Sequence, residues 1–97
     1  MDPAADEELI DAAVYYETQK AGLGADFLRA IRERLAALRT DSMESSRPPG
    51  VSPELPVRRV FVRRFPYVIV FVETFDEVRV IAIAHSHRKP GYWAKRL

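Results

Sequence analysis

The second half of the chain contains three apolar segments that are rich in β-branched and aromatic residues and too short to cross a membrane. They are residues 57–65 (VRRVFVRRF), 67–74 (YVIVFVET) and 78–85 (VRVIAIAH). Alternation in the first segment and apolar side chains on both faces of the other two predict strands rather than helices. The segments are joined only by Pro66 and by residues 75–77 (FDE), and turns this short connect antiparallel neighbours. We therefore predict a three-stranded antiparallel sheet.

The first of these segments carries most of the cations of the predicted sheet. Strict alternation places Arg59, Phe61, Arg63 and Phe65 on one face and Arg58, Val60, Val62 and Arg64 on the other. Three of the arginines (Arg59, Arg63 and Arg64) are candidates for gripping phosphates, each adding a salt-sensitive contribution to affinity. The same side chains also fit a solvated strand face or a surface that meets a protein partner.

The first half of the chain has the spacing of two amphipathic helices joined by a glycine-containing turn. The first helix is expected from Pro3 to near Lys20, because proline and carboxylates favour the first turn and glycines follow at 22 and 24. The second is expected over residues 25–39. Such an αα-hairpin must cover its apolar face, and the sheet is the only partner available. The apolar stripes are Leu9, Ala13 and Tyr16 with Ile10 and Val14 beside them, and then Phe27/Leu28, Ile31, Leu35 and Leu38.

Residues 40–56 (TDSMESSRPPGVSPELP) connect the helical half to the β half. They contain four prolines and four serines and show no periodicity. Proline removes backbone donors and breaks helices, so this segment is predicted to be a loop.

Length and composition indicate a single domain, residues 1–97, because 47% hydrophobic and 30% charged residues are ordinary for a globular protein. The chain has no cysteine, which excludes disulfides and thiolate metal sites. The acidic start MDPAADEEL lacks the apolar segment of a secretory signal, and no segment is long enough to span a bilayer. We therefore expect a cytoplasmic protein with no membrane partner.

The net charge of +1 conceals a strong segregation of charge along the chain. Residues 1–50 hold ten acids and six bases, a balance of −4, whereas residues 51–97 hold four acids and nine bases, a balance of +5. A polarised field of this kind suits an anionic partner such as nucleic acid or an acidic protein segment.

The segment after the third strand, SHRKPGYWAKRL, is predicted to turn at Pro90-Gly91 and to end in a helical turn. His85 precedes it, and its imidazole titrates near neutral pH, so it is a candidate acid or base. The alternative for His85 is a structural histidine that bonds to backbone, and Trp93 is expected to be a hydrophobic lid at the end of the sheet. His85 and His87 lack a third ligand in the sequence, so no metal and no cofactor are expected.

Four ordered pieces of sequence resemble the RelE/ParE superfamily of bacterial type II toxins. They are PAADEELIDAAVYYE, AGLGADFLRAIRERLAAL, VRRVFVRRFPYVIVFV and the closing IAHSHRKPGYWAKR, so the resemblance covers residues 3–96. It implies an α+β fold, with an N-terminal helical hairpin packed on a twisted antiparallel β-sheet. It also implies a cognate antitoxin protein as partner.

Within this superfamily the resemblance leaves the target open. RelE-like members cleave mRNA in the ribosomal A site, and ParE-like members share the fold without that catalytic set and inhibit DNA gyrase. Our first hypothesis is a ribosome-dependent mRNA endoribonuclease, whose partners are the ribosome and mRNA. The alternatives are a non-catalytic inhibitor of DNA gyrase and a degenerate member that retains only antitoxin binding.

RNA cleavage without a metal needs a base for the 2′-OH, an acid for the leaving 5′-oxygen and cations around the charged phosphorane. Arg88 and Tyr92 match the C-terminal basic and aromatic positions of RelE-like toxins. Val68 departs from the pattern, because many RelE-like nucleases carry an arginine at that position. The predicted catalytic residues are His85, Arg88 and Tyr92, and the predicted RNA- and phosphate-binding residues are Arg59, Arg63, Arg64 and Arg96.

The start of the chain also departs from the family, whose members usually begin with a β-strand before the first helix. Here the sequence enters the helix directly at Asp2-Pro3. Without that strand, a sheet edge is expected to expose backbone donors and acceptors and to invite pairing into a homo-oligomer.

Overall fold

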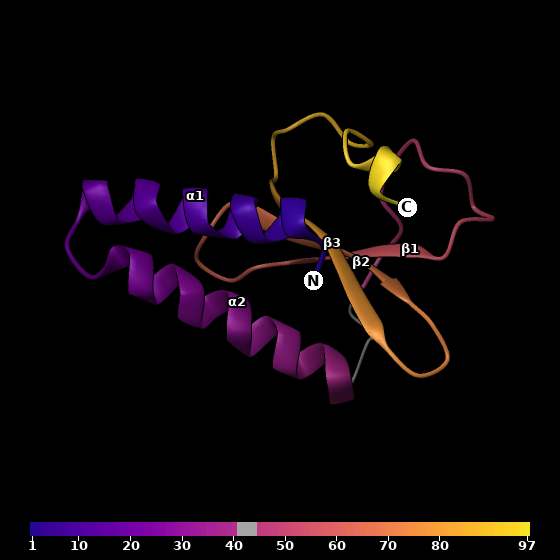
Figure 1. The fold of residues 1–97 in the computed structure, drawn as a ribbon, viewed down its shortest axis with the longest axis horizontal. Coiled ribbons are helices and arrows are strands. Elements are labelled where there is room, and N and C mark those ends of the chain that lie inside the picture. The colour runs from indigo at the N-terminus through magenta and orange to yellow at the C-terminus, as the bar shows by residue number, and fades with distance from the viewer. Residues whose placement is uncertain (41–44) are drawn as a thin grey trace.

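A computed structural model describes residues 1–40 and 45–97 of the protein. Two helices are followed by three strands and a short 3₁₀ turn, so the α+β prediction is confirmed (Figure 1). Residues 41–44, part of the predicted loop 40–56, lie outside the described residues. The elements are α1 (Pro3–Gln19), α2 (Leu23–Thr40), β1 (Val57–Phe61), β2 (Tyr67–Glu73), β3 (Val78–His85) and η1 (Ala94–Arg96).

Helix α1 begins and ends where the sequence provides caps. Asp2 is the N-cap, and its carboxylate accepts a hydrogen bond from the Ala4 N–H at 2.9 Å. After the helix, the Glu17 carboxylate accepts from the N–H groups of Gly22 at 2.9 Å and Gly24 at 3.0 Å. These bonds tie the end of α1 to the start of α2 and close the αα-hairpin.

The buried stripe of α1 differs from the predicted one. Ala5 and Ala12 are buried, and Leu9, Ala13 and Tyr16 pack against the same core. The expectation that Ile10 and Val14 widen this stripe is wrong, because their side chains are 59% and 58% exposed. The inner stripe uses small alanines, which allow close approach, and the side of the helix that carries Ile10 and Val14 is left uncovered.

The three strands form an open antiparallel sheet in the order β1-β2-β3, as predicted. Val60 lies opposite Ile69, and Ile69 lies opposite Ile83. Between the pairs Phe71–Val80 and Val70–Ala82 the register shifts, so β3 contains a bulge at Ile81. The bulge changes which face later β3 residues occupy.

Strand β1 is shorter than the predicted 57–65. It ends at Phe61, and Arg64 has a positive φ of 73°, which breaks the alternation before β2 begins. Phe65 is therefore buried among the same residues as Val60 and Val62. The prediction that it shares a face with Arg59 and Phe61 is wrong, because a left-handed residue intervenes.

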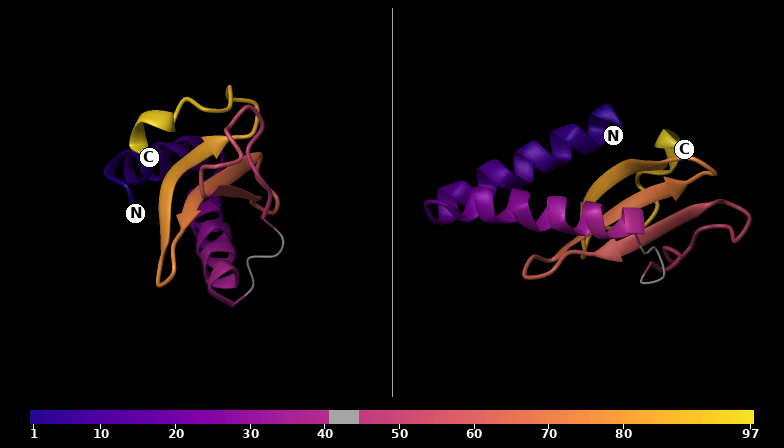
Figure 2. Two further views of the ribbon diagram at one scale, coloured as in Figure 1. Left: turned by 90° about the vertical axis from the view of Figure 1, so that its right-hand side faces the viewer. Right: turned by 90° about the horizontal axis from the view of Figure 1, so that it is seen from below.

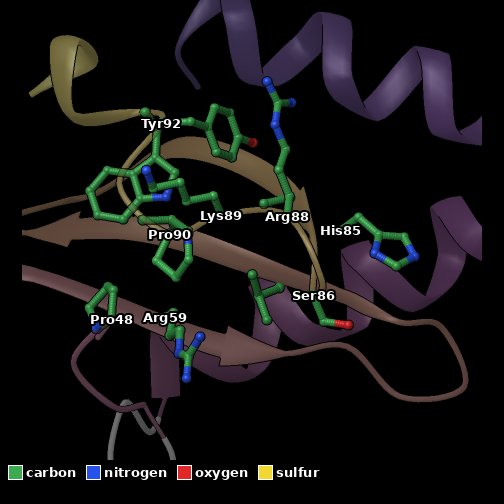
Figure 3. Close-up of a pocket in the computed structure, with 12 residues that line it drawn as sticks. Pro48, Arg59, His85, Ser86, Arg88, Lys89, Pro90 and Tyr92 are labelled. Carbon is green, nitrogen blue, oxygen red and sulfur yellow. The ribbon is translucent and has the colours of Figure 1, made fainter. Parts of the chain in front are cut away.

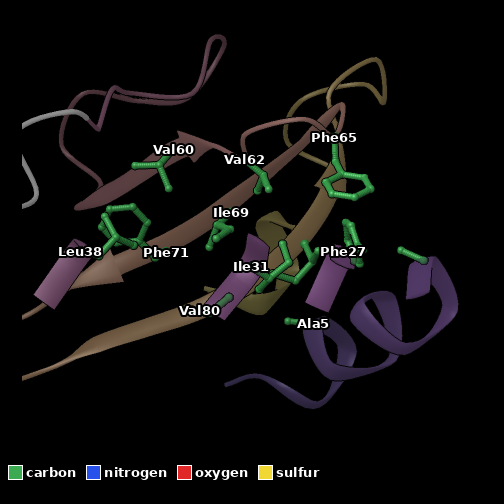
Figure 4. Packing of buried hydrophobic residues seen from close by; sticks show 12 residues of the cluster. Ala5, Phe27, Ile31, Leu38, Val60, Val62, Phe65, Ile69, Phe71 and Val80 are labelled. Atoms are coloured by element: carbon green, nitrogen blue, oxygen red, sulfur yellow. The ribbon is translucent and has the colours of Figure 1, made fainter. Parts of the chain in front are cut away.

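Both faces of the sheet are covered, and each forms its own core. Both helices lie on one side of the sheet (Figure 2), where Phe27, Ile31 and Phe71 are almost fully buried (Figure 4). On the opposite face Trp93, 2% exposed, packs over Val70 and its neighbours. Apolar residues on both faces of β2 and β3 are therefore explained by two cores, and Trp93 is the lid that the sequence predicted.

The free edge of β3 is partly covered by the two ends of the chain. The Asp2 N–H donates to the Val80 carbonyl at 2.9 Å, and the Arg96 guanidinium donates to the Ile81 carbonyl at 3.0 Å. These two contacts occupy part of the edge that was expected to be open. None of the described helices combines the length and the apolar character of a membrane span.

Candidate functional site

The carboxylate of Glu8, on α1, joins the helix to the edge of β3 and to the C-terminal tail. One oxygen accepts from Arg96 Nη1 at 2.8 Å and from the Ile83 N–H at 3.1 Å. The other accepts from the Tyr92 hydroxyl at 2.6 Å and from Arg96 Nη2 at 3.3 Å. Arg88 Nη1 lies 3.6 Å from the same carboxylate. We call Glu8, Arg88, Tyr92 and Arg96 the Glu8 cluster.

The tail is held in place for this cluster by a turn and a buried anchor. Gly91 has a φ of 91°, a conformation that favours glycine, and it reverses the chain after Pro90. Trp93 is buried against the sheet, which places Tyr92 beside α1 and lets η1 carry Arg96 back to Glu8. The sequence PGYW therefore positions Tyr92 directly and, through η1, also positions Arg96.

Tyr92 is a hydrogen-bond donor in this arrangement. Burial, followed by the hydrogen bond to Glu8 and the charge of that carboxylate, raises the pKa of its phenol far above the ordinary value, although Arg88 and Arg96 oppose the shift. The Arg88 guanidinium stacks 3.5 Å from the Tyr92 ring centre. A phenol in this environment keeps its proton at neutral pH and is poorly suited to act as a base.

Arg96 is a structural cation in the described geometry. Its side chain is 20% exposed, and it bonds both Glu8 oxygens and the carbonyl of the bulge residue Ile81. The hydrogen bond to Glu8 is the main cause that raises the pKa of Arg96. These three contacts leave few donors for an external phosphate.

His85 lies at the end of β3 and has no contact with Glu8 among the described interactions. Its Nδ1 accepts a hydrogen bond from the His87 backbone N–H at 3.1 Å, so the proton of the neutral ring resides on Nε2. The ring lies 5.4 Å from Tyr67 and the same distance from His87. A bond to backbone was the structural alternative for His85, although the ring remains exposed.

A shallow hollow lies between Arg59 and the tail, on the sheet face opposite the helices (Figure 3). Its volume is about 20 Å³, enough for roughly one water molecule, so it is a surface feature rather than a substrate pocket. Val68 contributes to its floor and is 5% exposed. Arg59, His85, Arg88 and Lys89 line it, and no carboxylate does among the described residues.

Arg63 and Arg64 lie elsewhere, in the connection between β1 and β2. They face α2, where Arg64 forms a long ion pair of 3.9 Å with Asp26. The predicted phosphate-binding arginines are therefore divided over three places: Arg59 beside the hollow, Arg96 within the Glu8 cluster, and the pair at 63 and 64 beside α2.

Glu8 was not predicted as a site residue. It stands in an acidic run, DEE, which fits the favourable charge of a helix N-terminus. A sharper signal was available, because Glu8 is three residues after Ala5 and four before Ala12, both buried. A carboxylate on the buried side of a helix is costly unless a cation or hydrogen-bond donor pairs with it, and the cationic tail supplies such groups.

Within residues 1–40 and 45–97, no three side chains of His, Asp or Glu gather closely enough to hold a metal ion.

Comparison with known proteins gives one family. The family model described as "ParE toxin of type II toxin-antitoxin system, parDE" matches residues 1–90. No curated protein and no solved structure matches the chain. Since the match covers nearly the whole sequence, the chain belongs to the ParE toxin family of type II toxin–antitoxin systems, within the RelE/ParE superfamily, and its partner is a cognate antitoxin.

Proposed function

We propose that the protein stops growth by binding DNA gyrase, not by cutting RNA. The observation that carries this proposal is the Glu8 cluster, in which one carboxylate engages Tyr92, Arg96 and, more weakly, Arg88. Arg88 and Tyr92 match the positions that a RelE-like nuclease would use on RNA, and Arg96 is a predicted phosphate-binding residue. Engaged internally, they hold the tail on α1 and are poorly placed for proton transfer.

Val68 supports the same proposal. It occupies the position where many RelE-like nucleases carry an arginine, and here it is buried beneath the hollow next to Tyr92 and Trp93. An arginine there would have to bury a charge in an apolar cluster. A hollow whose floor has an apolar residue in place of a phosphate-binding cation favours recognition of a protein target.

Binding and catalysis differ in stoichiometry, and a titration separates them. Purified toxin is added to gyrase in a supercoiling assay, and to a cell-free translation reaction that is programmed with preformed linear mRNA. We expect supercoiling to fail as toxin approaches molar equivalence with gyrase, whereas translation continues. Loss of translation at substoichiometric toxin, with discrete cuts in the mRNA and normal supercoiling, would overturn the proposal.

RNA cleavage is the second candidate, because Arg59, His85, Arg88 and Lys89 gather around one hollow. On that hypothesis His85, Arg88 and Tyr92 handle protons and phosphate charge. Arg88→Ala and Tyr92→Phe should then each reduce mRNA cuts by about tenfold or more, a typical contribution of a catalytic group. Lys95→Ala, which alters an exposed cation of the tail outside the hollow, is the control.

A further inference from the structure

A second cationic surface lies on the far side of α2 from α1, away from the Glu8 cluster. It is a groove of about 640 Å³ between α2 and the β1–β2 connection. Its floor includes Ala30 and Ala37, which are seven residues apart and so share one helix face. Arg29, Arg34, Arg63 and Arg64 line it, and we call it the arginine groove.

The backbone at Arg64 points to a role for its side chain outside the fold. Its φ of 73° lies in the left-handed region, where glycine or asparagine is unstrained and arginine is not. Its internal contacts are weak, a 3.9 Å ion pair with Asp26 and a distance of 5.7 Å to the Phe65 ring, and the side chain is 67% exposed. Neither contact accounts for an arginine at this turn.

The charge of the groove is positive and only partly compensated. Apart from Arg34, its arginines (Arg29, Arg63 and Arg64) face two acids, Asp26 and Glu33, which leaves +1 by count. Asp26 is shared, because it also pairs with Arg29 at 3.1 Å. Arg63 is exposed and makes no hydrogen bond or ion pair with any residue the structure describes.

The lining favours an acidic peptide over nucleic acid. Guanidinium groups bind carboxylates through two parallel hydrogen bonds, and a floor of alanines accepts small apolar side chains. Single-stranded nucleic acids are held by aromatic side chains that stack on bases. Among the described residues that line the groove, none is aromatic.

We propose that the arginine groove is a docking site for an acidic peptide segment of a partner protein, with its carboxylates on Arg63 and Arg64 and small apolar side chains over Ala30 and Ala37. The inference does not depend on the gyrase proposal, because it concerns a different surface and requires no toxic activity.

A labelled peptide of repeated Glu-Ala-Ala triplets tests the proposal by fluorescence anisotropy, with a labelled oligo-dT of equal charge as the competing ligand. Arg63→Gln and Arg64→Gly should each weaken peptide binding by about fivefold, since each removes one charge-assisted contact. Arg32→Gln is the matched control, an exposed arginine of α2 outside the groove, and it should change binding by less than about twofold.

Arg64→Gly separates binding from folding. Glycine relieves the left-handed strain, so we expect a higher Tm together with weaker peptide binding. Peptide binding that is absent in the wild type, unchanged in Arg64→Gly or equally reduced in Arg32→Gln would overturn the proposal. So would tighter binding of oligo-dT than of the peptide.

Discussion

The carboxylate of Glu8 satisfies a strand-edge N–H, a phenol and a guanidinium at once, and its side chain is only 16% exposed. Glu8→Gln removes the negative charge that faces Arg96, Arg88 and the Tyr92 phenol but keeps the shape of the side chain. We expect a loss of about 2–3 kcal/mol in the free energy of unfolding, measured with urea, because charged partners are left uncompensated.

Glu7→Gln is the matched control for this substitution. Glu7 is the exposed neighbour on α1, and its side chain makes no hydrogen bond or ion pair within the described residues. Its free energy of unfolding should change by less than about 0.5 kcal/mol, as is usual for a surface substitution. Equal effects of the two variants would show that the Glu8 cluster does not stabilise the fold.

The raised pKa of Tyr92 predicts a pH dependence at the alkaline end. The folded protein keeps this proton above the ordinary pKa of 10.0, where the unfolded chain loses it, so the stabilisation is complete below pH 10.0 and falls as pH rises. Tyr92→Phe should lower the free energy of unfolding by about 1 kcal/mol at neutral pH. It should also reduce the fall in that free energy above pH 10.0.

Unfolding in urea between neutral pH and pH 11 or so measures this effect. Tyr16 and Tyr67 also have a pKa raised by burial, so a smaller slope remains in the variant. Tyr15→Phe, which alters an exposed ring, is the control. A slope that is steeper in Tyr92→Phe than in the wild type would contradict the assignment.

The sequence predicted the buried position of Trp93 in the tail, but it did not predict Glu8 as the partner of the tail residues. Trp93 is predictable as a hydrophobic lid because a large aromatic residue that follows a Pro-Gly turn at the end of a sheet can pack onto that sheet. Glu8 is not predictable in this way, since pairing residue 8 with residue 96 depends on a long-range fold that spacing alone does not reveal. The prediction that Arg63 and Arg64 lie on a strand is wrong, because an alternating sequence pattern does not reveal a residue with left-handed backbone such as Arg64.

The elements themselves were largely predictable from periodicity. Both helices, β2, β3 and the antiparallel order follow from spacing and from the short turns. Two features were not: the early end of β1 at Phe61 and the bulge at Ile81. Each depends on one residue whose backbone departs from regular geometry, and such departures are set by packing around them.

The contact between α1 and α2 depends on Gly24. A Cβ added there would lie 2.6 Å from the Ala13 carbonyl oxygen, a backbone atom that cannot move without shifting α1. Gly24→Ala gains about 1 kcal/mol of helix propensity but should still destabilise the fold by about 2 kcal/mol net, because the helices must separate.

Thermal and urea unfolding of Gly24→Ala test this contact against Gly22→Ala. Gly22 has a φ of 90° and no heavy atom within 4 Å of an added Cβ, so its substitution should cost only the local strain, about 1 kcal/mol. A Gly24→Ala protein as stable as the wild type would mean that the helices do not approach as closely as described.

For the molecule as a whole, the segregation of charge along the chain has two structural outcomes. The acidic N-terminal half supplies Glu8 and the basic half supplies Arg88 and Arg96, so part of the positive charge is neutralised within the fold. The remainder is displayed on separate surfaces, beside the hollow at Arg59 and in the arginine groove. This distribution fits the proposal that protein partners bind this toxin over separate faces.

Induced expression followed by parallel analysis of plasmid topology and mRNA 5′ ends from one culture separates gyrase inhibition from RNA cleavage. We expect gyrase inhibition, seen as relaxed plasmid and trapped gyrase–DNA cleavage complexes with mRNA 5′ ends unchanged, and the same result for His85→Ala. Discrete cuts in ribosome-bound mRNA that disappear in Tyr92→Phe, while plasmid supercoiling stays normal, would contradict it.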